Sequence, residues 1–244
     1  MLPTPTALYP LTLPALLRYI LTTQADTCPT LLIICASRDT FVQDLATSLL
    51  HRGHRHTHGL EQLLVPTLHN LLTARHVRLA FCASVQALLA YLTAYRHSPA
   101  SLAEDADQRE RVILVNPLAL HAPTSSFSAQ GLSRCFAAAA DVALQAGVTL
   151  HIAECEEQRE RAQEHENEDT DTDMEDDHQE PSAETQTQDP WEQQVSILNV
   201  SARRFGSGSG ERAWAGRTVK AKLIAARWFR FHNLESQQTH ADQA

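Results

Sequence analysis

The chain has 244 residues, 43% of them hydrophobic, with a formal net charge of −9. This length predicts one or two domains, and the apolar fraction is sufficient for a buried core. No apolar run approaches the ~20 residues that cross a bilayer, and no secretory signal opens the chain, so we expect a soluble cytosolic or nuclear protein.

The first elements in chain order are a lead-in and a strand-helix unit. Residues 1–10 contain three prolines and are expected to be extended. Residues 13–21 predict a short amphipathic helix with proline in its first turn, and residues 30–35 a buried strand. Ser37 then caps a helix whose apolar residues, spaced by three and four, face the core. These apolar residues are Phe41, Val42, Leu45, Leu49 and Leu50.

Residues 51–59 hold four histidines, His51, His54, His56 and His58. Metal ligands are normally fixed on rigid elements, usually with help from a second segment. No cysteine or acidic cluster nearby completes such a site. We therefore interpret the segment as an exposed polar loop and expect no metal.

The next segments continue the alternation of helices and strands. Residues 60–75 are leucine-rich and predict a helix that begins at Pro66, and residues 77–82 predict a strand. Ser84 caps a helix that runs to Tyr95, and a polar connector follows. Elements that alternate in this way form a mostly parallel sheet with helices on both faces.

Residues 111–153 have the clearest pattern in the chain. A strand over residues 111–115 ends at Asn116, because the proline that follows cannot continue a ladder. Ser128 caps an alanine-rich helix, Gly147 ends it, and residues 148–153 form another strand. A strand, a crossover helix and a second strand predict a parallel βαβ unit.

Residues 154–190 form an acidic segment. Between residues 154 and 180, fourteen acidic and two basic residues give a net −12, and since the whole chain is −9, the remainder carries +3. The segment is almost free of large apolar groups and is predicted to be disordered, as is the tail at residues 233–244. Thr170 and Thr172 match acidophilic kinase sites, although a solvated spacer is the interpretation that we favour.

The C-terminal part, residues 191–232, completes the same α/β domain as residues 11–153. We expect strands at residues 195–200 and 218–225, with residues 227–231 as an extension. Eight basic residues against Glu211 alone lie between residues 201 and 232. With aromatic rings in a glycine-rich loop, they suit contact with single-stranded nucleic acid. The candidate residues are Arg203, Arg204, Phe205, Arg212, Trp214, Lys220 and Lys222. The alternative is that they decorate solvated strands or balance the acidic segment.

No set of catalytic residues emerges from the sequence. The five cysteines occur singly and are interpreted as buried free thiols in a reducing compartment. Cys155 and His151 lie too far apart along a strand to act as a nucleophile pair. Paired carboxylates occur only in the acidic segment, so we expect neither an enzyme nor a cofactor.

The order of these elements resembles the RecA-like core of the eukaryotic strand-exchange recombinases and their paralogues. Residues 30–49 resemble the strand and helix that follow the ATP-binding helix of that family, and residues 77–95 the next pair. Residues 111–153 resemble its second nucleotide-motif strand, the loop with its Ser-x-Gln helix start, and the following strand. The likeness covers roughly residues 28–153 and 195–231, and the last strands look antiparallel.

The departures from this family concern the nucleotide. The phosphate-binding signature G-x-x-x-x-G-K-[ST] is absent, and the glycine-serine run at residues 206–210 lacks the lysine that must follow. Only a short helix is expected before residue 30, with no room for a strand, loop and helix, so the fold is predicted to be truncated at its N-terminal nucleotide-binding end. Asn116 stands where a Mg²⁺-organising aspartate is expected, and asparagine is the weaker ligand. We therefore expect no ATP hydrolysis.

The resemblance implies a non-catalytic RecA-like subunit of a nuclear recombinase-paralogue complex, of the Shu type, that supports homologous recombination and DNA repair. Its expected partner is another RecA-like paralogue, with single-stranded DNA as a further candidate. The alternative is an ATPase-dead RecA-like accessory subunit of an Elongator-type complex that assists tRNA modification.

Overall fold

The computed structural model describes residues 4–24, 28–51, 65, 67–95, 109–155, 189–197 and 217–234. Residues 52–59 of the expected histidine loop, the two candidate kinase sites and most of the acidic segment and tail lie outside these ranges. The segment boundaries differ from those predicted. Glu154 and Cys155, predicted to begin the acidic segment, are buried directly after the strand that ends at Ala153, and Asn233, predicted to begin the tail, is the last residue of another strand.

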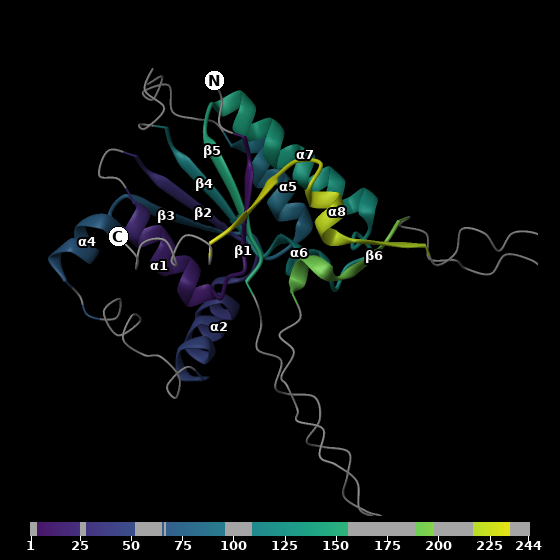
Figure 1. The fold of residues 1–244 in the computed structure, drawn as a ribbon. Helices are drawn as coiled ribbons and strands as arrows, with labels where there is room; N and C mark the ends of the chain where they lie inside the picture. Colours follow the sequence, from purple (N-terminus) through teal and green to yellow (C-terminus); the bar gives the residue numbers. More distant parts are fainter. Residues whose placement is uncertain are drawn as a thin grey trace, which may run out of the picture.

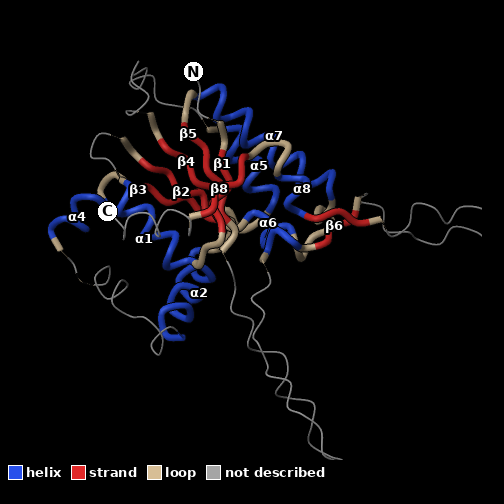
Figure 2. The backbone as a smooth tube through the Cα atoms, viewed as in Figure 1, coloured by secondary structure: helices blue, strands red, loops and turns tan. Residues whose placement is uncertain are grey.

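Six parallel strands form the central sheet, in the order β3-β2-β4-β5-β1-β8 (Figures 1 and 2). They are β1 (Thr6–Tyr9), β2 (Thr30–Ile34), β3 (Val77–Phe81), β4 (Arg111–Val115), β5 (Thr149–Ala153) and β8 (Arg230–Asn233). β4 lies inside the sheet, where it pairs with β2 on one side and β5 on the other. The structure confirms the predicted α/β fold with a mostly parallel sheet.

Alternate side chains of the strands enter two apolar clusters, one on each face of the sheet. In β2, Leu31 and Ile33 belong to one cluster, and Leu32 and Ile34 to the other. This is the period of two that a strand buried on both faces requires. The first face is covered by α5 (Val85–Ala94), α7 (Ala129–Ala146) and α8 (Ala221–Ala225), and the second by α1 (Leu13–Thr23) and α2 (Arg38–His51) (Figure 1).

Three helix boundaries that the sequence predicted are confirmed by their hydrogen bonds. The Ser84 hydroxyl accepts from the backbone N–H of Ala87 at the start of α5, and Ser128 caps α7 in the same way through Gly131. Gly147 ends α7 in the left-handed region at φ 68°, a conformation that costs glycine little. None of the described helices combines the length and the apolar character needed to cross a bilayer.

The N-terminal prediction is wrong in one respect. Residues 6–9 are not part of a lead-in but form β1, which lies between β5 and β8. β1, a three-residue turn and α1 therefore make the strand, loop and helix for which no room was expected. With four residues, of which only Ala7 and Leu8 are buried, β1 is too short to give a recognisable period.

The C-terminal segments also differ from their predictions. The strand expected over residues 195–200 is the three-residue β6 (Gln194–Ser196), which pairs antiparallel with β7 (Thr218–Lys220) in a separate ribbon. After β7 the chain turns into α8, because Ala221, Ile224 and Ala225 are buried at helical spacing. The last strands were expected to look antiparallel, which holds for β6 and β7 but not for β8, which joins the main sheet parallel to β1.

Candidate functional site

The carboxyl ends of the strands are the edge at which α/β sheets usually bind ligands. At this edge the turn from β1 to α1 consists of residues 10–12. Leu11 and Leu13 are buried there, in the apolar cluster that also contains Ile34 and Val115. A phosphate site needs backbone N–H groups that face the ligand. In this turn the residue at position 10 is proline, which has no N–H, and the leucine side chains fill the space beside the turn.

Asn116 follows β4 at the same edge. Its backbone has φ 57°, in the left-handed region that asparagine tolerates better than most residues. Its N–H donates to the carbonyl of Ala153 at 2.8 Å, and its side-chain oxygen accepts from the N–H of Cys155 at 2.8 Å. Asn116 therefore joins the ends of β4 and β5 with both backbone and side chain.

A buried carboxylate that the sequence analysis missed lies beside Asn116. Glu154, assigned there to the disordered acidic segment, is buried and accepts a hydrogen bond from the N–H of Leu118 in the short helix α6 (Pro117–His121). Its position directly after the strand pattern of β5 was the available signal, and the acidic composition downstream obscured it. Glu154 satisfies a backbone donor at the start of α6.

The thiols near this edge are protonated and structural. Burial, together with the nearby Glu154, raises the pKa of Cys135 to about 12. Burial also raises the pKa of Cys35, with Cys135, Glu154 and Cys82 adding to the effect. All five cysteines are free, and within the described ranges no group of three or more His, Cys, Asp or Glu side chains is placed to bind a metal ion.

His151 on β5 has a partly buried imidazole. Burial, together with electrostatic repulsion from Arg111 and His232, lowers its pKa to about 4. It is therefore neutral near pH 7. Cys155 is also buried, beyond the end of the same strand, and its backbone N–H is bonded to Asn116.

The candidate nucleic-acid residues divide into two groups. Arg203, Arg204, Phe205, Arg212 and Trp214 lie outside the described residues. Lys220 ends β7 and Lys222 lies in α8, and both ammonium groups point to one carboxylate. Lys220 Nζ lies 2.5 Å from Glu192 Oε2, and Lys222 Nζ lies 3.9 Å from Glu192 Oε1.

Aromatic rings fix the position of Lys222. Its Nζ lies 5.0 Å from the ring centroid of Tyr9, the last residue of β1, and 5.5 Å from that of Phe231 in β8. Trp191, in a 3₁₀ turn at Pro190–Glu192, packs edge-on against Phe231 with centroids 5.2 Å apart. A lysine held over two ring faces is both oriented and partly desolvated.

The β6–β7 ribbon gives residues 198–216 a fixed base. The N–H of Ile197 donates to the carbonyl of Arg217 at 3.1 Å, so the two ends of this segment are hydrogen-bonded together. Val195 is buried, and Ser196 forms a bridge to Ser128 at the start of α7. The segment that contains five of the candidate residues therefore leaves from and returns to a point close to Lys220.

A second feature is a set of exposed apolar side chains on α2, on and before the helix that precedes β3, and on the edge strand β3 itself. Its residues are between 52% and 81% exposed, and we call them the leucine surface: Val42, Val65, Leu68, Leu71, Leu72 and Leu79. Leu68, Leu71 and Leu72 belong to α4 (Leu68–Ala74), and Leu79 lies on the edge strand β3. The sequence predicted that Val42 faces the core, but it is 55% exposed, while Phe41 and Leu45 on the same helix pack against the apolar cluster.

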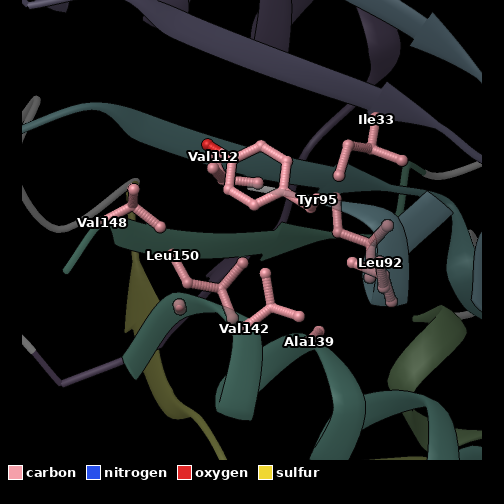
Figure 3. A pocket seen from close by; sticks show the side chains of 10 residues that line it. Ile33, Leu92, Tyr95, Val112, Ala139, Val142, Val148 and Leu150 are labelled. Carbon is pink, nitrogen blue, oxygen red and sulfur yellow. The ribbon is translucent and has the colours of Figure 1, made fainter. Parts of the chain in front are cut away.

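An apolar pocket of about 300 Å³ lies between the sheet and helices α5 and α7 (Figure 3). Its lining includes Val112 and Leu150 from the strands, Leu92 and Tyr95 from α5 and its end, and Val142 from α7. Much of this volume opens outward, and the enclosed part has room for about one water molecule. The pocket is a packing defect between layers and is too small for a ligand.

The sequence matches no known protein-family model and no curated protein.

Proposed function

We propose that this chain is a non-catalytic RecA-like subunit of a nuclear recombinase-paralogue complex that supports homologous recombination and DNA repair. The observation that carries the non-catalytic part is the turn between β1 and α1. At the edge where a nucleotide phosphate would bind, Leu11 and Leu13 are packed into the apolar cluster. A phosphate there would require a charged group to replace buried hydrocarbon, which is strongly unfavourable.

Asn116 supports the same proposal. Its side-chain oxygen is already used by the N–H of Cys155. The residue that stands in for the Mg²⁺-organising acid therefore has a structural task, which is to hold the ends of β4 and β5 together. The likeness of residues 111–153 to the recombinase core supplies the link to recombination.

The leucine surface supports an assembly role. Among the residues of α4 whose side chains are described, only Thr73 is buried, while three leucines are largely exposed. A helix of seven residues is unstable in water without packing of an apolar face. We assign this surface to the second RecA-like subunit, whose apolar face would cover the leucines and the edge strand β3.

The experiment is to purify the tagged full-length protein from the cells that express it and to identify the proteins that copurify in stoichiometric amounts. We expect a RecA-like paralogue, with the complex located in the nucleus. Elongator subunits in its place would contradict the proposal and support the tRNA-modification alternative. A chain recovered alone would also contradict it.

A further inference from the structure

Lys220 and Lys222 were singled out as nucleic-acid contacts, yet the structure pairs both with Glu192. The two ammonium groups approach opposite oxygens of the same carboxylate, at 2.5 Å and 3.9 Å. A carboxylate between two ammonium groups occupies the position that a phosphate oxygen would take in a nucleic-acid complex. The hydrogen bond from Lys220 lowers the pKa of Glu192, so the carboxylate is charged at neutral pH.

We propose that Glu192 competes within the chain with the phosphate groups of single-stranded DNA for Lys220 and Lys222. In the free protein the Glu192 carboxylate would then occupy the position of a DNA phosphate, and DNA binding would require this side chain to move away from the lysines. Lys222 would stay in place when it does, because its ammonium group is held independently over the rings of Tyr9 and Phe231.

The strengths of the contacts make such an exchange feasible. All three side chains are partly exposed, at 50% for Lys220, 35% for Lys222 and 37% for Glu192. Exposed ion pairs contribute little to stability, so a polyanion can displace the carboxylate. The position also suits a ligand, because Tyr9 ends β1 at the carboxyl edge of the sheet.

The competition predicts an increase in affinity when Glu192 is neutralised. In Glu192→Gln one negative charge is lost and two cations are released for phosphate. One additional phosphate contact steepens the dependence of log K on log salt by about 1, which corresponds to roughly five- to tenfold tighter binding near 50 mM salt. The gain should shrink as salt rises.

The test measures binding of a fluorescein-labelled oligothymidylate to the full chain by anisotropy, at about 50 mM and about 200 mM salt. Asp141→Asn is the matched control, since Asp141 is an exposed carboxylate on α7 bonded only locally to Gln145. The effect of Glu192→Gln is also measured in a variant that carries Lys220→Gln and Lys222→Gln. This comparison separates competition for the lysines from a general effect of the lost negative charge.

Competition requires that Glu192→Gln binds several-fold more tightly, that Asp141→Asn does not, and that the gain disappears without the two lysines. Equal gains for Glu192→Gln and Asp141→Asn, or a gain that persists without the lysines, would overturn the inference. So would failure of both the wild-type chain and Glu192→Gln to bind. The inference rests on the proposed function only for its ligand, and it fails separately from the copurification experiment, which does not depend on DNA.

Discussion

The side-chain oxygen of Asn116 accepts a hydrogen bond from the backbone N–H of Cys155 at 2.8 Å, which ties the end of β4 to the end of β5. Asn116 also holds a left-handed backbone conformation at φ 57°. Asn116→Ala should therefore lower the free energy of unfolding by about 1–2 kcal/mol, through the lost hydrogen bond and the strained backbone. Urea unfolding measures this change. Asn116→Gly, which relieves the backbone and loses only the hydrogen bond, should cost less, and equal losses in both variants would contradict this explanation.

The same position provides a test of the proposal that the chain does not hydrolyse ATP. Asn116→Asp restores the acid that the recombinase family would place after this strand. We nevertheless expect no phosphate release above background from the purified variant or the wild-type chain, because Leu11 and Leu13 remain buried in the turn after β1. Turnover by either protein, measured as inorganic phosphate released from ATP, would refute the non-catalytic proposal.

His151 predicts that stability falls in mild acid. Its pKa is about 4 in the folded protein and near 6.5 when the chain is unfolded. Between these values the unfolded state binds the extra proton, so stability is highest above pH 6.5 and decreases as the pH falls toward 4. At pH 5 the loss relative to pH 7 should be about 2 kcal/mol.

The check is urea unfolding at pH 7 and pH 5 for the wild type and His151→Gln. The variant should lose most of this pH dependence. A smaller decrease will remain, because burial also lowers the pKa of His121 and acts in the same direction. An unchanged pH dependence in His151→Gln would show that other groups are responsible.

At Gly131 in α7 we expect alanine to be less stable than glycine, which is the reverse of the usual preference in helices. Alanine normally stabilises a helix interior by about 1 kcal/mol relative to glycine. In this chain a Cβ at residue 131 would lie 2.1 Å from the carbonyl oxygen of Ser126, and a backbone atom cannot move away cheaply. Gly131→Ala should therefore reduce stability by about 1–3 kcal/mol in thermal or urea unfolding. Gln130→Ala, at an exposed position of the same helix, should be neutral or slightly stabilising.

How much of this architecture could be predicted depends on local signals. The unit from β4 to β5 was predicted correctly, because Ser128 and Gly147 mark the ends of α7 and its flanking strands are continuously apolar. β1 was not predicted, because the four residues between Pro5 and Pro10 are too few to show the alternation of buried and exposed side chains that marks a strand. The alternation over residues 218–225 favoured a strand, and packing of α8 against α7 decided otherwise.

The candidate site could be predicted only in part. Composition identified Lys220 and Lys222, but nothing in the spacing links them to Glu192, which lies beyond the Gly/Ser-rich segment, or to Tyr9 at the other end of the chain. These contacts arise because β1 and β8 are neighbours in the sheet. The sequence also could not predict that the leucines of α4 are exposed, because their spacing is the same as in a helix that packs on a core.

The leucine surface predicts a variant that loses its partner and keeps its fold. Leu68→Ser, Leu71→Ser and Leu72→Ser combined should abolish copurification of the second subunit. Stability of the isolated chain should change little, because all three side chains are exposed. Leu144→Ser, an equally exposed leucine on α7, is the matched control and should leave the complex intact. Retention of the partner by the triple variant would place the interface elsewhere.

The hydrogen bond between Ile197 and Arg217 has a consequence for how this protein can diverge. Because this bond and the pairing of β6 with β7 fix the register at described residues, the number of residues between Ile197 and Arg217 can change without shifting either strand. Insertions and deletions between these two residues, in evolution or by design, are therefore compatible with the same fold.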